Sequence, residues 1–317
     1  NSRIPIEKAL KDEKMSEEHK TTLRLAMKAK LFAEEKLKLK KSGSYSSYVA
    51  LNRPFVTYAV SAAPKWDLKH YQWNYLIVGK MPYKGFFNLE DAKLEEENLK
   101  KQNLDTYLRG VSAYSTLGWF DDPVLSSMMS YKNYDLVNTI IHETAHTTLY
   151  IKNSADFNER MAVFLGNQGS ELFYQELEGK DSATLRQVQL ENEDDKIFSE
   201  FISQELTQLE NWYKEQTQID KQTEERRTTR IKEIQSRFLE KIKPKLKTQI
   251  YDYFQKLDLN NARLNGYKTY MKDLSDFEKL YELVNHDFKK FIEKCQSLEK
   301  HHQPEEGLKK LISSLLN

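Results

Sequence analysis

The segment His142-Glu143-Thr144-Ala145-His146 has the residue types and the spacing of a catalytic metal site. Histidines at positions i and i+4 share one face of an α-helix, so His142 and His146 can direct both imidazoles at one metal ion. Glu143 follows the first histidine and projects to the side, where its carboxylate can take a proton from the water that the metal activates. The pattern therefore predicts two zinc ligands and a general base on one helix.

A third ligand is expected on the helix that follows. Residues 158–162 read Asn-Glu-Arg-Met-Ala and come a short turn after His146. An Asn-Glu-x-x-Ala string one helix after the histidines is where glutamate-zincins, a class of zinc peptidases, place their third protein ligand. Glu159 is therefore the predicted third ligand, although its separation from His146 is shorter than is usual in thermolysin-like enzymes.

The remaining histidines are not expected to bind the metal. Each is isolated or lies in a polar loop, where a histidine is more often a surface or capping residue: His19, His70, His286, His301 and His302. Two histidines and one carboxylate leave a coordination position open for water. That arrangement is typical of a catalytic zinc, because structural zinc sites are closed by four protein ligands. The sequence thus predicts one Zn²⁺ ion.

The overall composition limits the class of protein. The 317 residues include 49 basic and 48 acidic side chains, and the net charge of +1 gives no field that favours nucleic acid. Charged residues make up 31% of the chain while Gly (10) and Pro (7) are scarce, which favours long, solvated helices. The single cysteine, Cys295, excludes an intramolecular disulfide and a cysteine-rich zinc module.

Helices are expected to position the site. An apolar face that includes Leu136, Ile140 and Ala145 predicts a helix over residues 135–151, and a second helix is predicted over 155–177. Further helices are expected at 6–40 with a break near Met15, at 89–104 and over 251–317. Short strands are predicted at 55–60, 75–78 and 114–120, with a turn at 82–85.

A long antiparallel helical hairpin is predicted between about residues 190 and 250. Apolar residues at spacings of three and four mark two arms, 198–212 and 231–246, and the polar stretch 216–230 separates them. Pro244 is expected to interrupt the return arm. We expect the hairpin to cover the cleft or to pack on the core; a gate or a partner-docking arm is the alternative.

These elements indicate an α+β fold that is predominantly α. We expect a zincin-like core with a small β-sheet, and in addition the long helical hairpin. Residues 1–180 are expected to hold the N-terminal helices, the sheet and the zinc-binding helices. The hairpin then occupies 181–255, and the C-terminal helices over 256–317 complete the catalytic domain.

Several strings across the chain resemble the bacterial putative aminopeptidase family, which belongs to the glutamate-zincins. Besides the His142–His146 motif, the matching strings are Arg53-Pro54-Phe55, residues 82–87, residues 115–125, Phe157-Asn158-Glu159, residues 259–264 and Tyr270. The resemblance implies a zinc peptidase with His142, His146 and Glu159 as ligands and Glu143 as the base. Thr144 replaces the apolar residue more usual at its position, a change that we expect to be tolerated.

The resemblance also implies a location in the periplasm or at the cell envelope. Members of the family commonly carry an N-terminal export signal, and some are lipid-anchored. The present sequence opens at Asn1 without an initiator Met, and it contains neither a signal peptide nor an apolar run that could span a membrane. We therefore expect a mature form whose export signal, and possible lipid anchor, lay upstream.

Residues that contact the substrate are expected outside the metal motif. Zincin peptidases bind substrate along an edge strand, for which the candidate residues are Tyr114, Ser115, Thr116, Leu117 and Gly118; an ordinary core strand is the alternative. A tyrosine hydroxyl commonly stabilises the tetrahedral intermediate. We favour Tyr270 for its place in the matched segment, over Tyr267, Tyr83 and Tyr114. Asn261, like Asn260, is expected to line the pocket or to cap a helix.

The predicted function is hydrolysis of peptide bonds in a peptide or protein substrate by a zinc-dependent aminopeptidase. An aminopeptidase needs carboxylates that hold the free amine of its substrate, and Asp121, Asp122 and Glu90 are candidates. An endopeptidase of the same fold is the first alternative. The second is a non-catalytic helical interaction protein with a vestigial metal site. The intact Glu143 argues against it, because a purely structural site has no use for a base.

Overall fold

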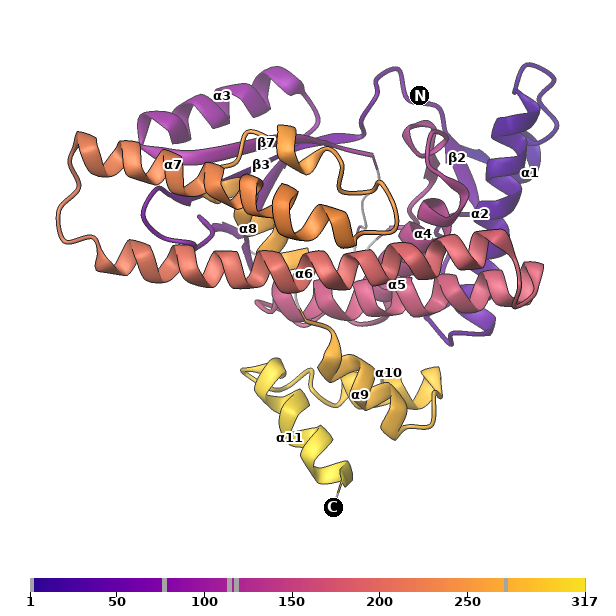
Figure 1. The fold of residues 1–317 in the computed structure, drawn as a ribbon. Coiled ribbons are helices and arrows are strands. Elements are labelled where there is room, and N and C mark those ends of the chain that lie inside the picture. The colour runs from indigo at the N-terminus through magenta and orange to yellow at the C-terminus, as the bar shows by residue number, and fades with distance from the viewer. Residues whose placement is uncertain (1–2, 76–78, 113–115, 117–119, 271–272, 317) are drawn as a thin grey trace. The chain divides into compact units, whose positions relative to one another are not determined.

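The computed structural model of the chain describes residues 3–75, 79–112, 116, 120–270 and 273–316 (Figure 1). The internal contacts divide the chain into two units. Unit 1 contains residues 1–57, 110–188 and 274–317, and unit 2 contains residues 58–109 and 189–273. Helices predominate and the strands form small sheets, which confirms the predicted α+β, predominantly α, fold class. The zincin type of the core stays a prediction, and so does the expected division of the chain into residues 1–180, 181–255 and 256–317.

Unit 1 is mainly helical. Its longer helices are α2 (Glu17–Glu35), α4 (Asn133–Thr148), α5 (Ala155–Glu178) and α11 (Pro304–Leu316), and its shorter ones are α1 (Ile6–Ala9), α9 (Ser275–Leu283) and α10 (Phe288–Gln296). The break predicted near Met15 is confirmed, because Ser16 caps α2 by accepting a hydrogen bond from the His19 amide at 3.2 Å. The predicted extension of this helix to residue 40 is wrong. The chain leaves the helix after Glu35, and Lys38 adopts a φ of 61°.

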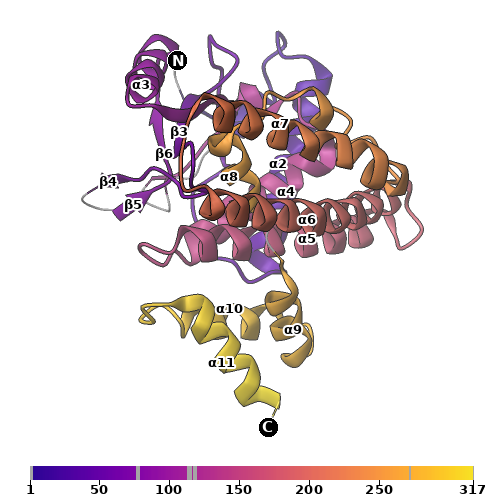
Figure 2. The same ribbon diagram turned by 60° about the vertical axis from the view of Figure 1, so that its left-hand side comes forward.

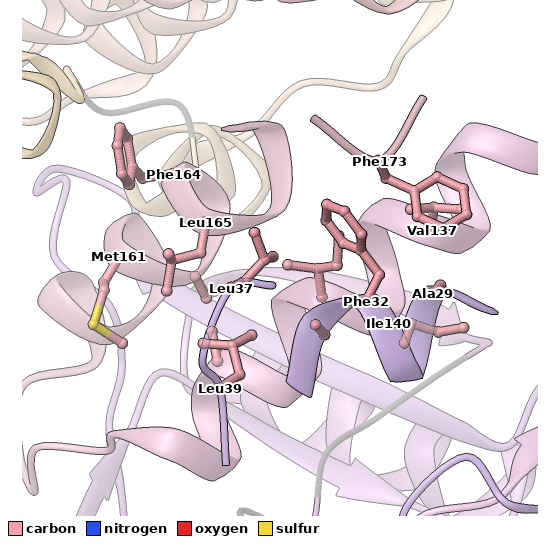
Figure 3. Close-up of a cluster of buried hydrophobic side chains, with 14 of the residues drawn as sticks. Ala29, Phe32, Leu37, Leu39, Val137, Ile140, Met161, Phe164, Leu165 and Phe173 are labelled. Atoms are coloured by element: carbon pink, nitrogen blue, oxygen red, sulfur yellow. The ribbon is translucent and has the colours of Figure 1, made fainter. Parts of the chain in front are cut away.

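The core of unit 1 lies where α4 packs against α2 and α5. Figure 3 shows Ala29 and Phe32 of α2 close to Val137 and Ile140 of α4 and to Phe173 of α5. The rings of Phe32 and Phe173 meet edge to face with centroids 5.3 Å apart. These side chains are buried, so the helix that carries the predicted histidines is fixed on its apolar side.

A small sheet in unit 1 leads the chain into the site. Strand β2 (Ser47–Val49) is central; β1 (Ile4–Pro5) pairs with it antiparallel and β8 (Val124–Leu125) pairs with it parallel. Strand β8 is fully buried and is followed by the 3₁₀ turn η1 (Ser126–Met128) and then by α4. The strand therefore places the start of α4 on the core.

Unit 2 contains a second three-stranded sheet in the order β6-β3-β7, formed by β3 (Thr57–Pro64), β6 (Tyr83–Phe86) and β7 (Leu104–Val111). Strands β4 (Trp73–Tyr75) and β5 (Gly79–Met81) form a separate antiparallel ribbon, visible in Figure 2. Helix α3 (Leu89–Lys101) packs beside β6.

Predictions for the segments of this sheet were partly wrong. The predicted strand at 55–60 overlaps β3. The predicted turn at 82–85 is wrong, because Gly85 pairs with Ala59 in the ladder between β6 and β3. The predicted strand at 75–78 coincides with β4 only at Tyr75, and residues 76–78 lie outside the described part of the chain.

The predicted helical hairpin is confirmed. Helices α6 (Ala183–Glu215) and α7 (Lys221–Arg237) lie side by side in both ribbon views. The predicted separator 216–230 is wrong for most of its length, because α7 begins at Lys221. Asp220 caps α7 by accepting a hydrogen bond from the Thr223 amide at 2.8 Å. Most of residues 221–230 are exposed on the surface of α7. A polar sequence alone therefore does not indicate a loop.

The return arm of the hairpin ends near Pro244, as predicted. A π-helical turn, η2 (Phe238–Ile242), and a 3₁₀ turn, η3 (Lys243–Lys245), replace the α-helix there. The segment that follows is held to α6 by the fully buried Asp194, whose carboxylate accepts hydrogen bonds from the Lys247 amide (2.9 Å) and the Thr248 amide (2.7 Å). Helix α8 (Asn261–Tyr270) completes unit 2.

Candidate metal centre

Helix α4 buries a regular apolar face, and the polar residue on its buried side is hydrogen-bonded within the helix. Leu136, Ile140 and Ala145 are fully buried, which agrees with the face predicted from the sequence. Thr144 is also buried, and its hydroxyl donates to the Ile140 carbonyl at 2.6 Å. The polar residue in the motif thus has a hydrogen-bond partner within its own helix. This contact explains why a threonine fits where an apolar residue is more usual.

The connection between α4 and α5 brings the glutamate back to the histidines. Leu149 is extended after the end of α4, and Asn153 turns the chain with a φ of 62°. Asn158, which is 1% exposed, then binds the backbone of Ile151 with both ends of its amide. Its Oδ1 accepts from the Ile151 amide at 2.9 Å, and its Nδ2 donates to the Ile151 carbonyl at 2.8 Å. Glu159, the next residue, is therefore held close to the end of α4.

Three predicted ligands converge on one point. The Nε2 atoms of His142 and His146 lie 3.2 Å apart. The carboxylate of Glu159 lies 3.4 Å from the His142 Nε2 through Oε2, and 3.6 Å from the His146 Nε2 through Oε1. A tetrahedral zinc ion with bonds of about 2.0–2.1 Å holds its ligand atoms about 3.3 Å apart. The Nε2–Nε2 separation and the two Nε2–O separations, which involve different oxygens of Glu159, are close to that value.

The donor set of the cluster is one that zinc binds. Without a metal, the two Nε2 atoms lie within hydrogen-bond distance of each other, and each lies within ion-pair distance of the Glu159 carboxylate. Two imidazole nitrogens and a carboxylate oxygen are the ligands that zinc takes in a catalytic site, with one position left for water. His142, His146 and Glu159 could therefore hold one metal ion.

The two carboxyl groups at the cluster differ in their affinity for protons. Burial raises the pKa of Glu143 to about 7; the His142 charge opposes this shift, and the carboxyls of Glu159 and Asp122 add to it. Burial also acts on Glu159, but the charges and hydrogen bonds of His146 and His142 outweigh it and hold the pKa of Glu159 well below its usual range. The difference between the two pKa values means that Glu159 stays ionised, whereas Glu143 can exchange protons near neutral pH.

The predicted substrate strand lies largely outside the described residues, which include neither Tyr114, Ser115, Leu117 nor Gly118. Thr116 and Phe120 are described, and neither is in a strand. The Thr116 hydroxyl accepts from the Phe120 amide at 3.1 Å, and the Thr116 amide donates to the carboxylate of the buried Asp122 at 2.8 Å. Asp122 therefore anchors Thr116, and its charge also acts on Glu143.

The other predicted site residues belong to unit 2. Asn261 is fully buried there, accepts from the Tyr213 hydroxyl at 2.7 Å and donates to the Pro64 and Lys65 carbonyls at 2.9 Å each. Asn260 caps α8 by accepting from the Arg263 amide at 3.0 Å. The side chain of Tyr270 lies outside the described part of the structure. Its role stays a prediction.

One tyrosine at the cluster was missed in the sequence. Tyr150 comes directly after α4, and its phenol is close enough to Glu159 for the two groups to interact electrostatically. Burial, and then the charge of Glu159, raise the pKa of this phenol, so it keeps its proton. The sequence gives no local signal for it, because Tyr150 lies beyond the end of α4, where a helical spacing no longer places side chains on one face.

The fold and the cluster define a helix-rich α+β protein with a candidate metal centre of two histidines and one glutamate. The chain belongs to a family described as "Putative aminopeptidase", whose sequence profile matches residues 1–311. Family membership supports a peptidase activity. Comparison with curated proteins and with solved structures gives no match.

Proposed function

We propose that the protein is a zinc-dependent aminopeptidase with one Zn²⁺ ion held by His142, His146 and Glu159. The observation that carries this proposal is the convergence of two imidazole nitrogens and one carboxylate, with an Nε2–Nε2 separation of 3.2 Å and Nε2–O separations of 3.4 and 3.6 Å. The family description supports the peptidase class and the preference for a free amino terminus. A bound zinc ion would polarise a water molecule and the carbonyl of the scissile peptide bond.

The residues around the cluster supply the proton transfers. The Glu143 carboxylate accepts a proton from the attacking water and then delivers it to the nitrogen of the leaving amine. The raised pKa of Glu143 suits both proton transfers near neutral pH. A bound cation would lower this pKa and so favour the carboxylate, which is the form that acts as the base. Tyr150, whose phenol keeps its proton and interacts electrostatically with Glu159, is our candidate for a hydrogen-bond donor to the oxygen of the tetrahedral intermediate.

We base the proposed substrate class and the proposed location on the family to which the chain belongs. We infer a peptide or protein substrate. We retain the cell envelope as the proposed location and an upstream lipid anchor as a prediction. Among the described residues, none of the helices has the length and the apolar character that crossing a bilayer requires.

The test combines metal analysis with a panel of paired peptides, each supplied with a free and with an acetylated amino terminus. We expect about one equivalent of zinc and cleavage of the free peptides alone. Cleavage of the acetylated peptides would instead favour an endopeptidase. The matched control is Glu143→Gln, which keeps the shape of the side chain and the three ligands, and we expect it to bind zinc but to lose activity by about 10²–10⁴-fold. Undiminished activity of this variant would rule out Glu143 as the base, and absence of zinc would rule out the metal centre.

A further inference from the structure

On two sides of the ligand cluster, asparagine amides join helix α5 to its surroundings, once to the connection that follows α4 and once to α4 itself. On one side, Asn158 pairs with both backbone groups of Ile151 at 2.9 and 2.8 Å, directly before Glu159. On the other side, the Asn138 Nδ2 donates to the Asn167 Oδ1 at 3.0 Å. Asn138 lies one helical turn before His142 and on the same face of α4. The two amide contacts therefore bracket the cluster.

The second contact depends on close approach of the helices. A Cβ atom added to Gly166 of α5 would lie 2.8 Å from the Asn138 Oδ1, which is closer than real Cβ contacts. Glycine is the residue that leaves this space free. Because the Asn138 amide rests against a glycine and is hydrogen-bonded to Asn167, the separation of α4 and α5 is fixed at this level.

The histidine rings need such external support. A metal-binding histidine usually donates its second ring N–H to a partner, which fixes the orientation of the ring. The Nδ1 of His146 is buried and has no hydrogen-bond partner among the residues that the structure describes. The direction of its Nε2 therefore depends on where α4 is held relative to Glu159, which is what the two amide contacts determine.

We propose that Asn138 and Asn158 are positioning residues that preorganise His142, His146 and Glu159 for the metal. This inference rests on the proposed zinc site. Residues that orient metal ligands without touching the metal typically change its affinity by 10–100-fold. Asn158→Ala removes both bonds to Ile151, and Asn138→Ala removes the bond to Asn167. We expect each variant to bind zinc about 10–100-fold more weakly.

The experiment measures the zinc affinity of the full chain by competition with a chromophoric chelator. The matched control is Asn133→Ala, because Asn133 is an exposed asparagine on the same helix. We expect this control to bind zinc as the unchanged chain does. Cobalt replaces zinc in parallel, and its visible spectrum reports the ligand geometry. In Asn138→Ala and Asn158→Ala the spectrum should shift, whereas a loss of stability alone would leave the spectrum of the folded fraction unchanged.

The outcomes separate the two proposals. If the unchanged chain binds no zinc, the proposed function fails. If it binds zinc and the folded variants bind zinc equally well with the same cobalt spectrum, the positioning role is overturned while the metal site stands. Asn167→Ala covers the case in which Asn158→Ala does not fold. It removes the acceptor of the Asn138 Nδ2 at α5, so it should weaken zinc binding as Asn138→Ala does.

Discussion

Replacement of Asp194 by alanine should strongly destabilise unit 2. The fully buried Asp194 carboxylate accepts from the Lys247 amide at 2.9 Å, and from the amide and the hydroxyl of Thr248 at 2.7 Å each. A donor that loses its acceptor costs about 1–3 kcal/mol, and the lower end applies here because Lys247 is exposed and Thr248 is half-buried. Water can enter part of the space left by the side chain, so we expect the loss in unfolding free energy to be about 3–5 kcal/mol in total.

Two further variants calibrate this value. Asp194→Asn keeps one acceptor oxygen for Thr248 but turns an amide donor toward Lys247, so we expect a loss of about 1–3 kcal/mol. Asp220→Ala is the matched control in the same hairpin. The exposed Asp220 carboxylate serves the Thr223 amide as a helix cap at 2.8 Å, and its loss should cost about 1 kcal/mol.

Urea unfolding measures all three changes. Tryptophan fluorescence is a suitable signal because Trp66 and Trp212 pack against the aromatic core of unit 2, where the Phe198 and Tyr251 rings stack 3.9 Å apart. Unfolding free energies come from linear extrapolation to zero urea. If Asp194→Ala is no less stable than Asp220→Ala, the three hydrogen bonds do not have the strength that their burial implies.

Three other predictions concern unit 1. Zinc should raise the melting temperature of the unchanged chain but not that of Glu159→Gln, measured by calorimetry with and without a chelator, because an ion that binds only the folded state stabilises it by mass action. Tyr150→Phe should lower kcat by about 10²-fold with little change in zinc content, if its hydroxyl stabilises the intermediate; an unchanged kcat would assign the donor elsewhere. Burial raises the pKa of the Cys295 thiol, so labelling by a thiol reagent should begin only when unit 1 unfolds, and rapid labelling of the native protein would contradict its burial.

Local patterns in the sequence predicted the site helices well. Helix α4 was predicted over 135–151 and occupies 133–148, and α5 was predicted over 155–177 and occupies 155–178. Both helices bury a regular apolar face, which a periodicity of 3.6 reveals without knowledge of the partner. The meeting of Glu159 with the two histidines also followed from a short connection between the helices.

Pairings between distant segments could not be predicted in this way. Tyr83 to Phe86 contains the turn-forming Gly85, and only the presence of β3 makes it a strand. Strand β7 was not predicted at all, because its sequence mixes charged and apolar residues. The bond between Asn138 and Asn167 and the proximity of Asp122 to Glu143 depend on packing, for which a single sequence gives no local signal.

Unit 1 is assembled from three separate stretches of the chain, and this arrangement affects the order of folding. Phe164 of α5 packs against Phe277 of α9 and Phe291 of α10, with ring centroids 6.2 and 5.0 Å apart. During synthesis the helices that carry the histidines and Glu159 emerge long before these aromatic partners. A nascent chain therefore exposes the Phe164 side of α5 until residues beyond 291 have left the ribosome, and the metal-binding helices complete their core only at the end of translation.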